Sequence, residues 1–392
     1  MSFDQLATLD PADIDEPATL ATPSTSCATR QVLHIVNGEH YAGAERVQDL
    51  LALQLPQFGY DVTFACVCPK VFPKTRRSNV RLIDASMTGK FDLRPAWQLA
   101  KLVREEGFEL IHSHTPRSAM IGRAVSFLTG VPLVHHLHSP TSRDSTRRWS
   151  NCANMWIERA SMSHARALVA VSQSLAGYAK QMKARDERVF VIPNGVPIRG
   201  PLADRPTPTT AWTIGCVALF RPRKGIEVLL DALAELIAMG HDVRLRAVGT
   251  FETPAYGEEI MRRVDQLKLA NHIEWRGFQT DVDAEFRQMD LFVLPSLFGE
   301  GMPMVVLEAM ANGVPVISTR VEGVPEAVRD GVDGLLADPG NAASLALAIS
   351  QFIAGDVDWS DMRQAAHRRH AECFSDRSMA EKLARVYDVV LG

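Results

Sequence analysis

Residues 213–249, TIGCVALFRPRKGIEVLLDALAELIAMGHDVRLRAVG, hold two short apolar runs separated by a segment with helical spacing. TIGCVAL and VRLRAVG have the length and apolar content of buried strands, and residues 226–239 predict a helix between them. A strand, a helix and a second strand in this order form the unit of parallel sheets that helices cover on both faces.

The same alternation extends in both directions along the chain. Toward the C-terminus we expect a helix near 258–269, strands at IEWRGF and LFVLPS, a helix over 303–312 and a strand at PVISTR. Toward the N-terminus the predicted strands are VLHIV, DVTFACV, ELIHSH, PLVHHLH, ALVAVS and RVFVIP. Because the stretch 197–210 is rich in proline, it predicts a linker between domains at 30–196 and 211–375. The sequence thus predicts an α/β protein with two Rossmann-like, doubly wound domains facing each other, with functional residues just after the strands.

The two ends of the chain differ in character. Residues 1–29 have no sustained periodicity, so we expect a disordered tail. Residues 376–392 form a separate predicted helix, in which Ser378 and Glu381 make a capping box and Leu383 and Tyr387 share an apolar face.

Composition narrows the class of protein. A length of 392 residues suits two domains, and 42 Lys plus Arg against 46 Asp plus Glu give a net charge of −4, which indicates no nucleic-acid partner. The apolar runs are too short to span a membrane and the N-terminus lacks the features of a secretion signal, so we expect a cytoplasmic protein. The six cysteines are too few for a disulfide scaffold and are expected to be reduced.

The stretch FGEGMPMVVLEAMANGVPV (298–316) is the richest in chemistry. Glu300 falls on the loop before the predicted helix and Glu308 within that helix, where carboxylates can accept hydrogen bonds from sugar hydroxyls. The N–H groups of Met302, Met304 and Val305 are expected to point out of the helix N-terminus, where phosphate binds readily. Together these features suit a nucleotide sugar. The alternative is a solvated loop glutamate and an ordinary exposed helix glutamate.

A basic turn, FRPRKG (220–225), follows the first strand of the second domain. Arg221, Arg223 and Lys224 place three cations at a strand end, where they can neutralise a diphosphate. The alternative is a basic surface turn.

Two histidine runs, HSH (112–114) and HHLH (135–138), end predicted strands of the first domain. Alternation puts His112 and His114 on one face of their strand, and His136 and His138 on one face of theirs. A metal site, a substrate or acid–base site, and packed histidines are all compatible with this pattern. Metal is the least favoured of these because no acidic ligand is spaced with the histidines and no H-E-x-x-H helix occurs.

These motifs together resemble the retaining glycosyltransferases of family 4, which have the GT-B fold of two Rossmann-like domains facing across a deep cleft. The resemblance runs along most of residues 31–391. AGAE (42–45) resembles the family's G-G-x-E loop, and IHSH with VHHLH resembles its histidine strands. RKG (223–225) resembles the phosphate-binding K-G, and GEGMPMVVLEAMA resembles the E-x7-E signature. IPNGVP, the DGVDGLL region and the C-terminal helix, which returns to the first domain in the family, follow in family order.

The resemblance implies transfer of a sugar from a nucleotide diphosphate to an acceptor hydroxyl with retention of configuration. It implies that Glu300 contacts the donor sugar, Glu308 the ribose and Lys224 the diphosphate. His138 is expected beside the transferred sugar, and Gly43 where backbone approaches the donor phosphate or the acceptor. Lys224 and helix N–H groups are expected to hold the leaving-group charge, with no metal and no covalently bound cofactor.

One departure from the family pattern concerns the donor charges. The family usually carries an arginine five residues before the K-G lysine, where this chain has Leu219, and Arg221 or Arg223 is our candidate replacement. Two rival hypotheses stay open, a sugar-nucleotide epimerase on the same fold and a non-catalytic subunit that binds nucleotide sugars.

The sequence leaves the substrates open. UDP is the default nucleotide because it is the commonest in the family. The segment 139–159 combines arginines with tryptophans, which suits peripheral contact with an anionic membrane surface and a saccharide or lipid-linked acceptor. A solvated loop is the alternative for that segment.

Overall fold

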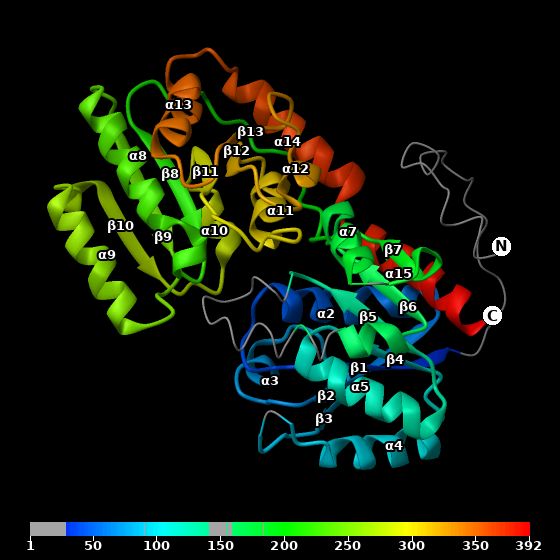
Figure 1. The fold of residues 1–392 in the computed structure, drawn as a ribbon. Helices are drawn as coiled ribbons and strands as arrows, with labels where there is room; N and C mark the ends of the chain where they lie inside the picture. The colour runs from blue at the N-terminus through cyan, green and yellow to red at the C-terminus, as the bar shows by residue number, and fades with distance from the viewer. Residues whose placement is uncertain (1–28, 90, 141–154, 156–158, 183) are drawn as a thin grey trace. The chain divides into compact units, whose positions relative to one another are not determined.

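The computed structural model describes residues 29–89, 91–140, 155, 159–182 and 184–392. The described chain divides into two compact units, one ending at Pro193 and including Asp376–Gly392, the other Asn194–Ser375. Each unit is built around one parallel sheet with helices packed on it (Figure 1). The predicted N-terminal tail lies, apart from residue 29, outside the described residues.

The sheet of the first unit has the strand order β3-β2-β1-β4-β5-β6-β7, and its strands pair in parallel. The strands are β1 (Arg30–Val36), β2 (Tyr60–Cys66), β3 (Leu82–Asp84), β4 (Leu110–Ser113), β5 (Leu133–Leu137), β6 (Ala167–Ala170) and β7 (Val189–Val191). The helices are α2 (Gly43–Gln54), α3 (Phe72–Thr75), α4 (Arg94–Glu106), α5 (Pro116–Thr129), α7 (Gln173–Gln181) and α15 (Asp376–Leu391), with 3-10 turns η2 (Leu55–Phe58) and η4 (Asp186–Arg188).

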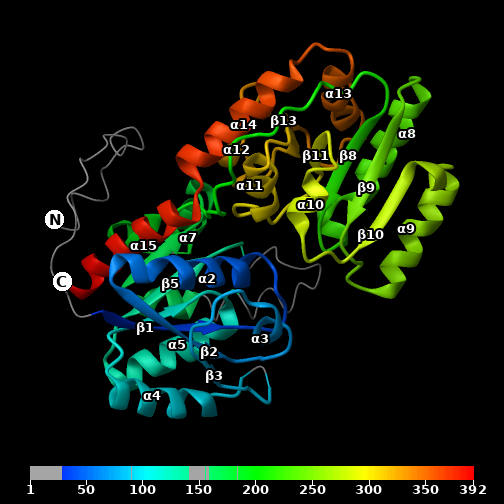
Figure 2. The ribbon, with the colours of Figure 1, turned by 180° about the vertical axis from the view of Figure 1, so that it is seen from behind.

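The C-terminal helix α15 packs within the first unit, beside α2 and η2 (Figure 2). Its apolar face, which includes Leu383 and Tyr387, is fully buried. The predicted capping box is wrong, because the helix already begins at Asp376 and Ser378 therefore lies inside its first turn.

The sheet of the second unit has the order β10-β9-β8-β11-β12-β13, again with parallel pairing. Its strands are β8 (Trp212–Val217), β9 (Val243–Val248), β10 (Ile273–Gly277), β11 (Leu291–Leu294), β12 (Val316–Thr319) and β13 (Gly334–Ala337). Its helices are α8 (Ile226–Ala238), α9 (Pro254–Gln266), α10 (Val282–Phe286), α11 (Met304–Ala311), α12 (Val324–Ala327), α13 (Ala342–Ile353) and α14 (Trp359–Cys373), with 3-10 turns η5 (Pro222–Lys224) and η6 (Ala270–His272).

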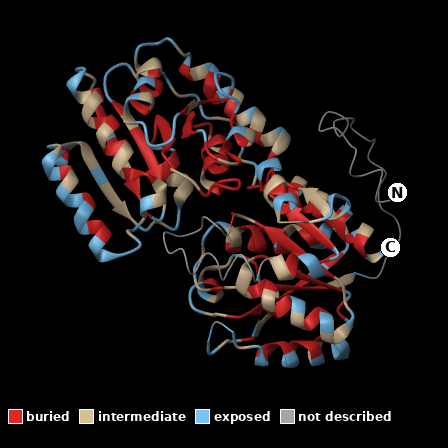
Figure 3. Ribbon diagram, in the orientation of Figure 1, coloured by how far each residue is buried: buried red, intermediate tan, exposed pale blue. Residues whose placement is uncertain are grey.

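The inner strands of both sheets are largely buried, the edge strands β3, β7 and β10 only partly, and the helices keep exposed outer faces (Figure 3). Burial on both faces explains why inner strands such as β6 and β11 are continuous apolar runs. The prediction of an α/β chain with two Rossmann-like sheets is confirmed. In the second sheet the chain order reverses between β8 and β11, so the loops after these two strands diverge at the carboxyl edge, where such sheets bind ligands.

Candidate functional site

The loops that follow β8 and β11 are joined to each other. The backbone N–H of Leu297 donates to the carbonyl oxygen of Arg223 at 2.8 Å. Gly225 has φ +65°, and a Cβ on it would lie 2.1 Å from the carbonyl oxygen of Pro295. Only glycine permits both this backbone conformation and this approach. The K-G dipeptide therefore has a structural reason: its glycine lets the loop bearing the lysine lie against the loop bearing Glu300.

Glu300 is the buried centre of this junction. Its Oε1 accepts a hydrogen bond from Lys224 Nζ at 2.5 Å and one from Ser296 Oγ at 2.6 Å, and Arg223 Nη1 lies 3.6 Å away. Burial raises the pKa of the Glu300 carboxyl, but the charges of Lys224 and Arg223 and the two hydrogen bonds outweigh it, so the net pKa is below 4.5. Burial lowers the pKa of Lys224, and the Glu300 charge opposes that change. The junction therefore holds an ionised carboxylate among cations.

The two arginines of the basic turn have different surroundings. The Arg223 guanidinium donates to the carbonyl oxygen of Gly299 at 3.0 Å and is mostly buried, so it belongs to the loop of Glu300. Arg221 instead pairs with Glu252 at 3.5 Å, and Leu219 is 38% exposed. Of the two candidate replacements for the family arginine, Arg223 is the one that reaches Glu300.

Helix α11 begins a few residues after Glu300. Pro303 is its N-cap and Met304 its first residue. The N–H groups of Met304 and Val305 have no carbonyl four residues earlier in the helix to bond to, which is the condition for anion binding at a helix N-terminus. Met302 precedes the cap, and its carbonyl oxygen accepts a hydrogen bond from Asn194 Nδ2 at 2.8 Å. Glu308 is buried on the same helix, so the alternative of an exposed helix glutamate is wrong.

Two residues at this junction were missed by the sequence reasoning. Ser296 orients the Glu300 carboxylate, as described above. Glu322 follows β12 with φ +30°, and its Oε2 accepts hydrogen bonds from the backbone N–H groups of Gly299 and Glu300 at 2.9 and 3.2 Å. Ser296 follows β11 and Glu322 follows β12, and these strands are neighbours in the sheet. Knowledge of the strand order would therefore have placed both residues at the same carboxyl edge as Glu300.

The first unit holds the other predicted site residues. Gly43 is the first residue of α2, and a Cβ added there would meet no atom within 4 Å, so packing inside the protein does not require glycine. His138 follows β5, and its Nε2 lies 3.0 Å from Nδ1 of His114. Burial lowers the pKa of His138 to about 3. The ring is therefore neutral at pH 7.

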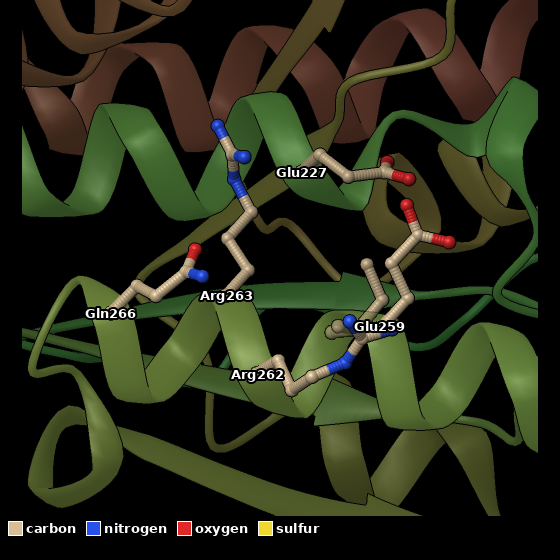
Figure 4. A pocket seen from close by; sticks show the side chains of 6 residues that line it. Glu227, Glu259, Arg262, Arg263 and Gln266 are labelled. Carbon is tan, nitrogen blue, oxygen red and sulfur yellow. The ribbon is translucent and has the colours of Figure 1, made fainter.

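A surface pocket between α8 and α9 contains none of the predicted site residues (Figure 4). Among its lining residues, Glu227 accepts a hydrogen bond from the Tyr256 hydroxyl and Arg263 pairs with Asp231. The junction after β8 and β11 is the better candidate site because it lies at the carboxyl edge of the sheet where the strand order reverses, the place at which such sheets bind ligands.

Family comparison agrees with this geometry. The model described as Glycosyltransferase Family 4 matches residues 41–199, and the model described as Glycosyl transferases group 1 matches residues 211–355. The chain belongs to the family 4, group 1 glycosyltransferases. The recognition made from the sequence motifs is confirmed, and the protein is a glycosyltransferase enzyme.

Similar curated proteins are also glycosyltransferases. The phosphatidyl-myo-inositol mannosyltransferase of Mycobacterium leprae is 28% identical over 72% of this chain and 74% of its own length. The D-inositol 3-phosphate glycosyltransferase of Corynebacterium glutamicum is 28% identical over 72% of each chain. A putative colanic acid biosynthesis glycosyltransferase of Salmonella typhimurium is 29% identical over 57% of this chain and 56% of its own length.

Solved structures establish the GT-B fold of this glycosyltransferase. Anabaena HepE, solved with UDP and glucose, superposes with a TM-score of 0.81 at 22% identity, covering 92% of this chain and 99% of HepE. Sucrose-phosphate synthase from Thermosynechococcus elongatus gives a TM-score of 0.76 at 21% identity, covering 92% of this chain and 98% of the synthase.

Two further expectations concern membranes and cysteines. Among the described helices, none combines the length and apolar character needed to cross a bilayer. Most of the segment 139–159, to which we assigned membrane contact, lies outside the described residues. The four cysteines within the described ranges, Cys66, Cys68, Cys216 and Cys373, are free thiols.

Proposed function

We propose that this glycosyltransferase moves a sugar from a nucleotide-diphosphate donor to an acceptor hydroxyl with retention of anomeric configuration. The observation that carries the proposal is the grouping of Lys224, Arg223 and Glu300 where β8 and β11 diverge, a few residues before the free N–H groups of α11. Cations and helix amides suit a diphosphate, and a carboxylate among them suits sugar hydroxyls.

The roles of the residues follow from their chemistry. Lys224, Arg223 and the N–H groups of Met304 and Val305 bind the diphosphate and stabilise its charge as the bond to the sugar breaks. Glu300 accepts hydrogen bonds from the donor sugar near its anomeric carbon, and Glu308 from the ribose. We assign no nucleophile. Because fixed cations supply the charge, donor binding requires no Mg²⁺.

The first unit contributes the remaining assignments. We assign His138 to the transferred sugar, and Gly43 to close approach of the backbone to the donor phosphate or the acceptor. The space at Gly43 supports its role, since no atom of the described residues would lie within 4 Å of a Cβ there.

The donor is proposed to be a UDP-sugar, and the acceptor a saccharide or lipid-linked compound of cell-surface polysaccharide or glycolipid synthesis. The UDP complex of HepE supports the first choice. The second choice is supported by relatives named as a phosphatidyl-myo-inositol mannosyltransferase, a D-inositol 3-phosphate glycosyltransferase and a putative colanic acid biosynthesis glycosyltransferase. We further propose that the enzyme works at the cytoplasmic face of a membrane.

A donor panel tests the proposal. Thermal unfolding is measured with UDP-glucose, GDP-mannose and ADP-glucose, each with and without Mg²⁺. At about a hundred times its Kd, a bound donor adds about 2.7 kcal/mol of stability. We expect stabilisation by the UDP-sugar, equal with and without Mg²⁺, and its loss in K224M. Stabilisation by a different nucleotide overturns only the choice of UDP.

Turnover then separates the enzyme classes. The stabilising donor is incubated with inositol phosphate, phosphatidylinositol vesicles and oligosaccharides, and products are identified by mass spectrometry and by the anomeric coupling in NMR. An α-linked product from an α-linked donor is the expected result. Conversion of the donor to its epimer without acceptor supports an epimerase instead. Stabilisation by a donor, with neither a product nor donor hydrolysis, supports a non-catalytic subunit that binds nucleotide sugars.

A further inference from the structure

Five histidines lie on one face of the first unit's sheet. His34 on β1 pairs in register with His112 on β4, and residue 134 of β5 pairs with His112 in turn. Because side chains alternate along a strand, His114, His136 and His138 share the face of His34 and His112. The rings of His112 and His114 are stacked with their centroids 4.2 Å apart, those of His136 and His138 with theirs 4.4 Å apart, and His34 lies edge-on to His112.

Some of the ring nitrogens have hydrogen-bond partners among the described residues, and others do not. The Tyr387 hydroxyl lies 3.0 Å from Nε2 of His34 and 2.5 Å from Nδ1 of His112, so one nitrogen of each is occupied. His136 is 1% exposed, and within the described part of the chain neither of its ring nitrogens has a hydrogen-bond partner. A neutral imidazole carries one donor and one acceptor, and leaving both buried and unpaired is costly.

Nitrogens of three of these rings lie close together. Nδ1 of His114 and Nε2 of His138 are 3.0 Å apart and share a hydrogen bond, while neither nitrogen of His136 has a partner among the described residues. One ring nitrogen from each of His114, His136 and His138 lies within 4.8 Å of the other two. A tetrahedral ion with metal–nitrogen bonds of about 2.0–2.1 Å holds its ligand nitrogens about 3.3 Å apart. Small ring movements therefore bring the three nitrogens to coordination distance.

We propose that His114, His136 and His138 bind a transition-metal ion of the zinc type. Three neutral imidazoles without carboxylate suit Zn²⁺, Co²⁺, Ni²⁺ or copper and do not suit Mg²⁺ or Ca²⁺. Three protein ligands leave a fourth position for water, and the partial exposure of His138 gives that position access to solvent. The proposal departs from the expectation from the sequence, in which metal was the least favoured use of these histidines.

A second group of three, His34, His112 and His114, also meets the distance criterion. It is the poorer site because Tyr387 holds one nitrogen on each of two of its members, whereas the first group contains His136, whose two nitrogens both have no partner among the described residues. The choice between the two groups is part of the test.

The test uses the full-length protein after dialysis against a chelator. Zn²⁺ is titrated by calorimetry, and Co²⁺ is followed by its visible absorption bands, with no donor or acceptor present. We expect one ion per chain and cobalt bands of a four- or five-coordinate ion. In H136Q the Kd should rise by at least about tenfold, the lower limit of what even outer-shell changes cost metal sites.

Neighbouring histidines supply the controls. His135 is equally buried on the same strand but points to the opposite face, where Ser113 Oγ lies 3.0 Å from its Nδ1, so H135Q should bind metal like the wild type. Far-UV circular dichroism without metal checks the fold of each variant, and H138Q repeats the test if H136Q fails to fold. Absence of stoichiometric binding by the wild type overturns the proposal. So does undiminished binding by a folded H136Q, or loss in H112Q alone.

Discussion

Removal of the Lys224 ammonium tests whether Glu300 is held by a buried ion pair. The two side chains are 14% and 6% exposed, so K224M leaves an ionised carboxylate in the interior. Breaking a buried pair from one side costs about 3–5 kcal/mol. Arg223, 3.6 Å from Glu300, replaces part of the lost charge, so we expect the low end, about 3 kcal/mol.

Two further variants, E300Q and K224M/E300Q, measure the interaction energy between Lys224 and Glu300. E300Q leaves the Lys224 ammonium without its carboxylate partner, whereas K224M/E300Q removes both charges together. The double variant should therefore be less destabilised than the sum of the single variants by about 2 kcal/mol. Equilibrium urea unfolding of the full-length protein supplies the free energies, and calorimetry should show a fall in Tm of about 6–12 °C for K224M, given a unit of this size.

A second ion pair in the same loop provides the control. Arg221 and Glu252 are 25% and 45% exposed, so R221M should cost less than about 1 kcal/mol. The reasoning is refuted if K224M costs no more than R221M, or if the effects of K224M and E300Q add within about 0.5 kcal/mol.

Three further predictions concern backbone, pH and the C-terminal helix. G225A should destabilise the second unit by more than the 1–2 kcal/mol typical of a left-handed residue, because its Cβ would also collide with Pro295. G240A is the control, since its Cβ would meet none of the described residues within 4 Å, and an equal Tm for the two variants argues against the collision. Burial raises the pKa of Glu45 to about 7 from 4.5, so folding takes up a proton at pH values between these two. The contribution of Glu45 to the free energy of unfolding is therefore complete below pH 4.5, and about 3 kcal/mol is lost as the pH rises past 7. The free energy of unfolding, measured with urea at pH 5 and pH 8, should therefore fall less in E45Q than in the wild type. An equal fall in the two proteins contradicts the prediction. Y387F removes the hydroxyl that contacts two buried histidines and should cost about 1–3 kcal/mol, measured as a fall in Tm; an unchanged Tm contradicts this.

Much of the candidate site was predictable because its signals are local. The run 213–249 predicted β8, α8 and β9 from spacing alone, and both the basic turn and Glu300 were placed after strand ends. The exact start of α11 was less predictable, because a cap is decided by one or two residues: the helix was expected from Pro303, which is its N-cap, and it begins at Met304.

The sequence by itself determined the alternation of strands and helices, the doubly wound class and the order of the family motifs, because burial periodicity and motif spacing are properties of neighbouring residues. Only the tertiary structure decided that Arg223 rather than Arg221 reaches Glu300, and that Glu322 holds the loop amides beside it. It also decided that buried histidines from three strands pack together on one face next to Tyr387. These contacts join residues far apart in the chain, and strand order and register, which local spacing does not encode, bring them together.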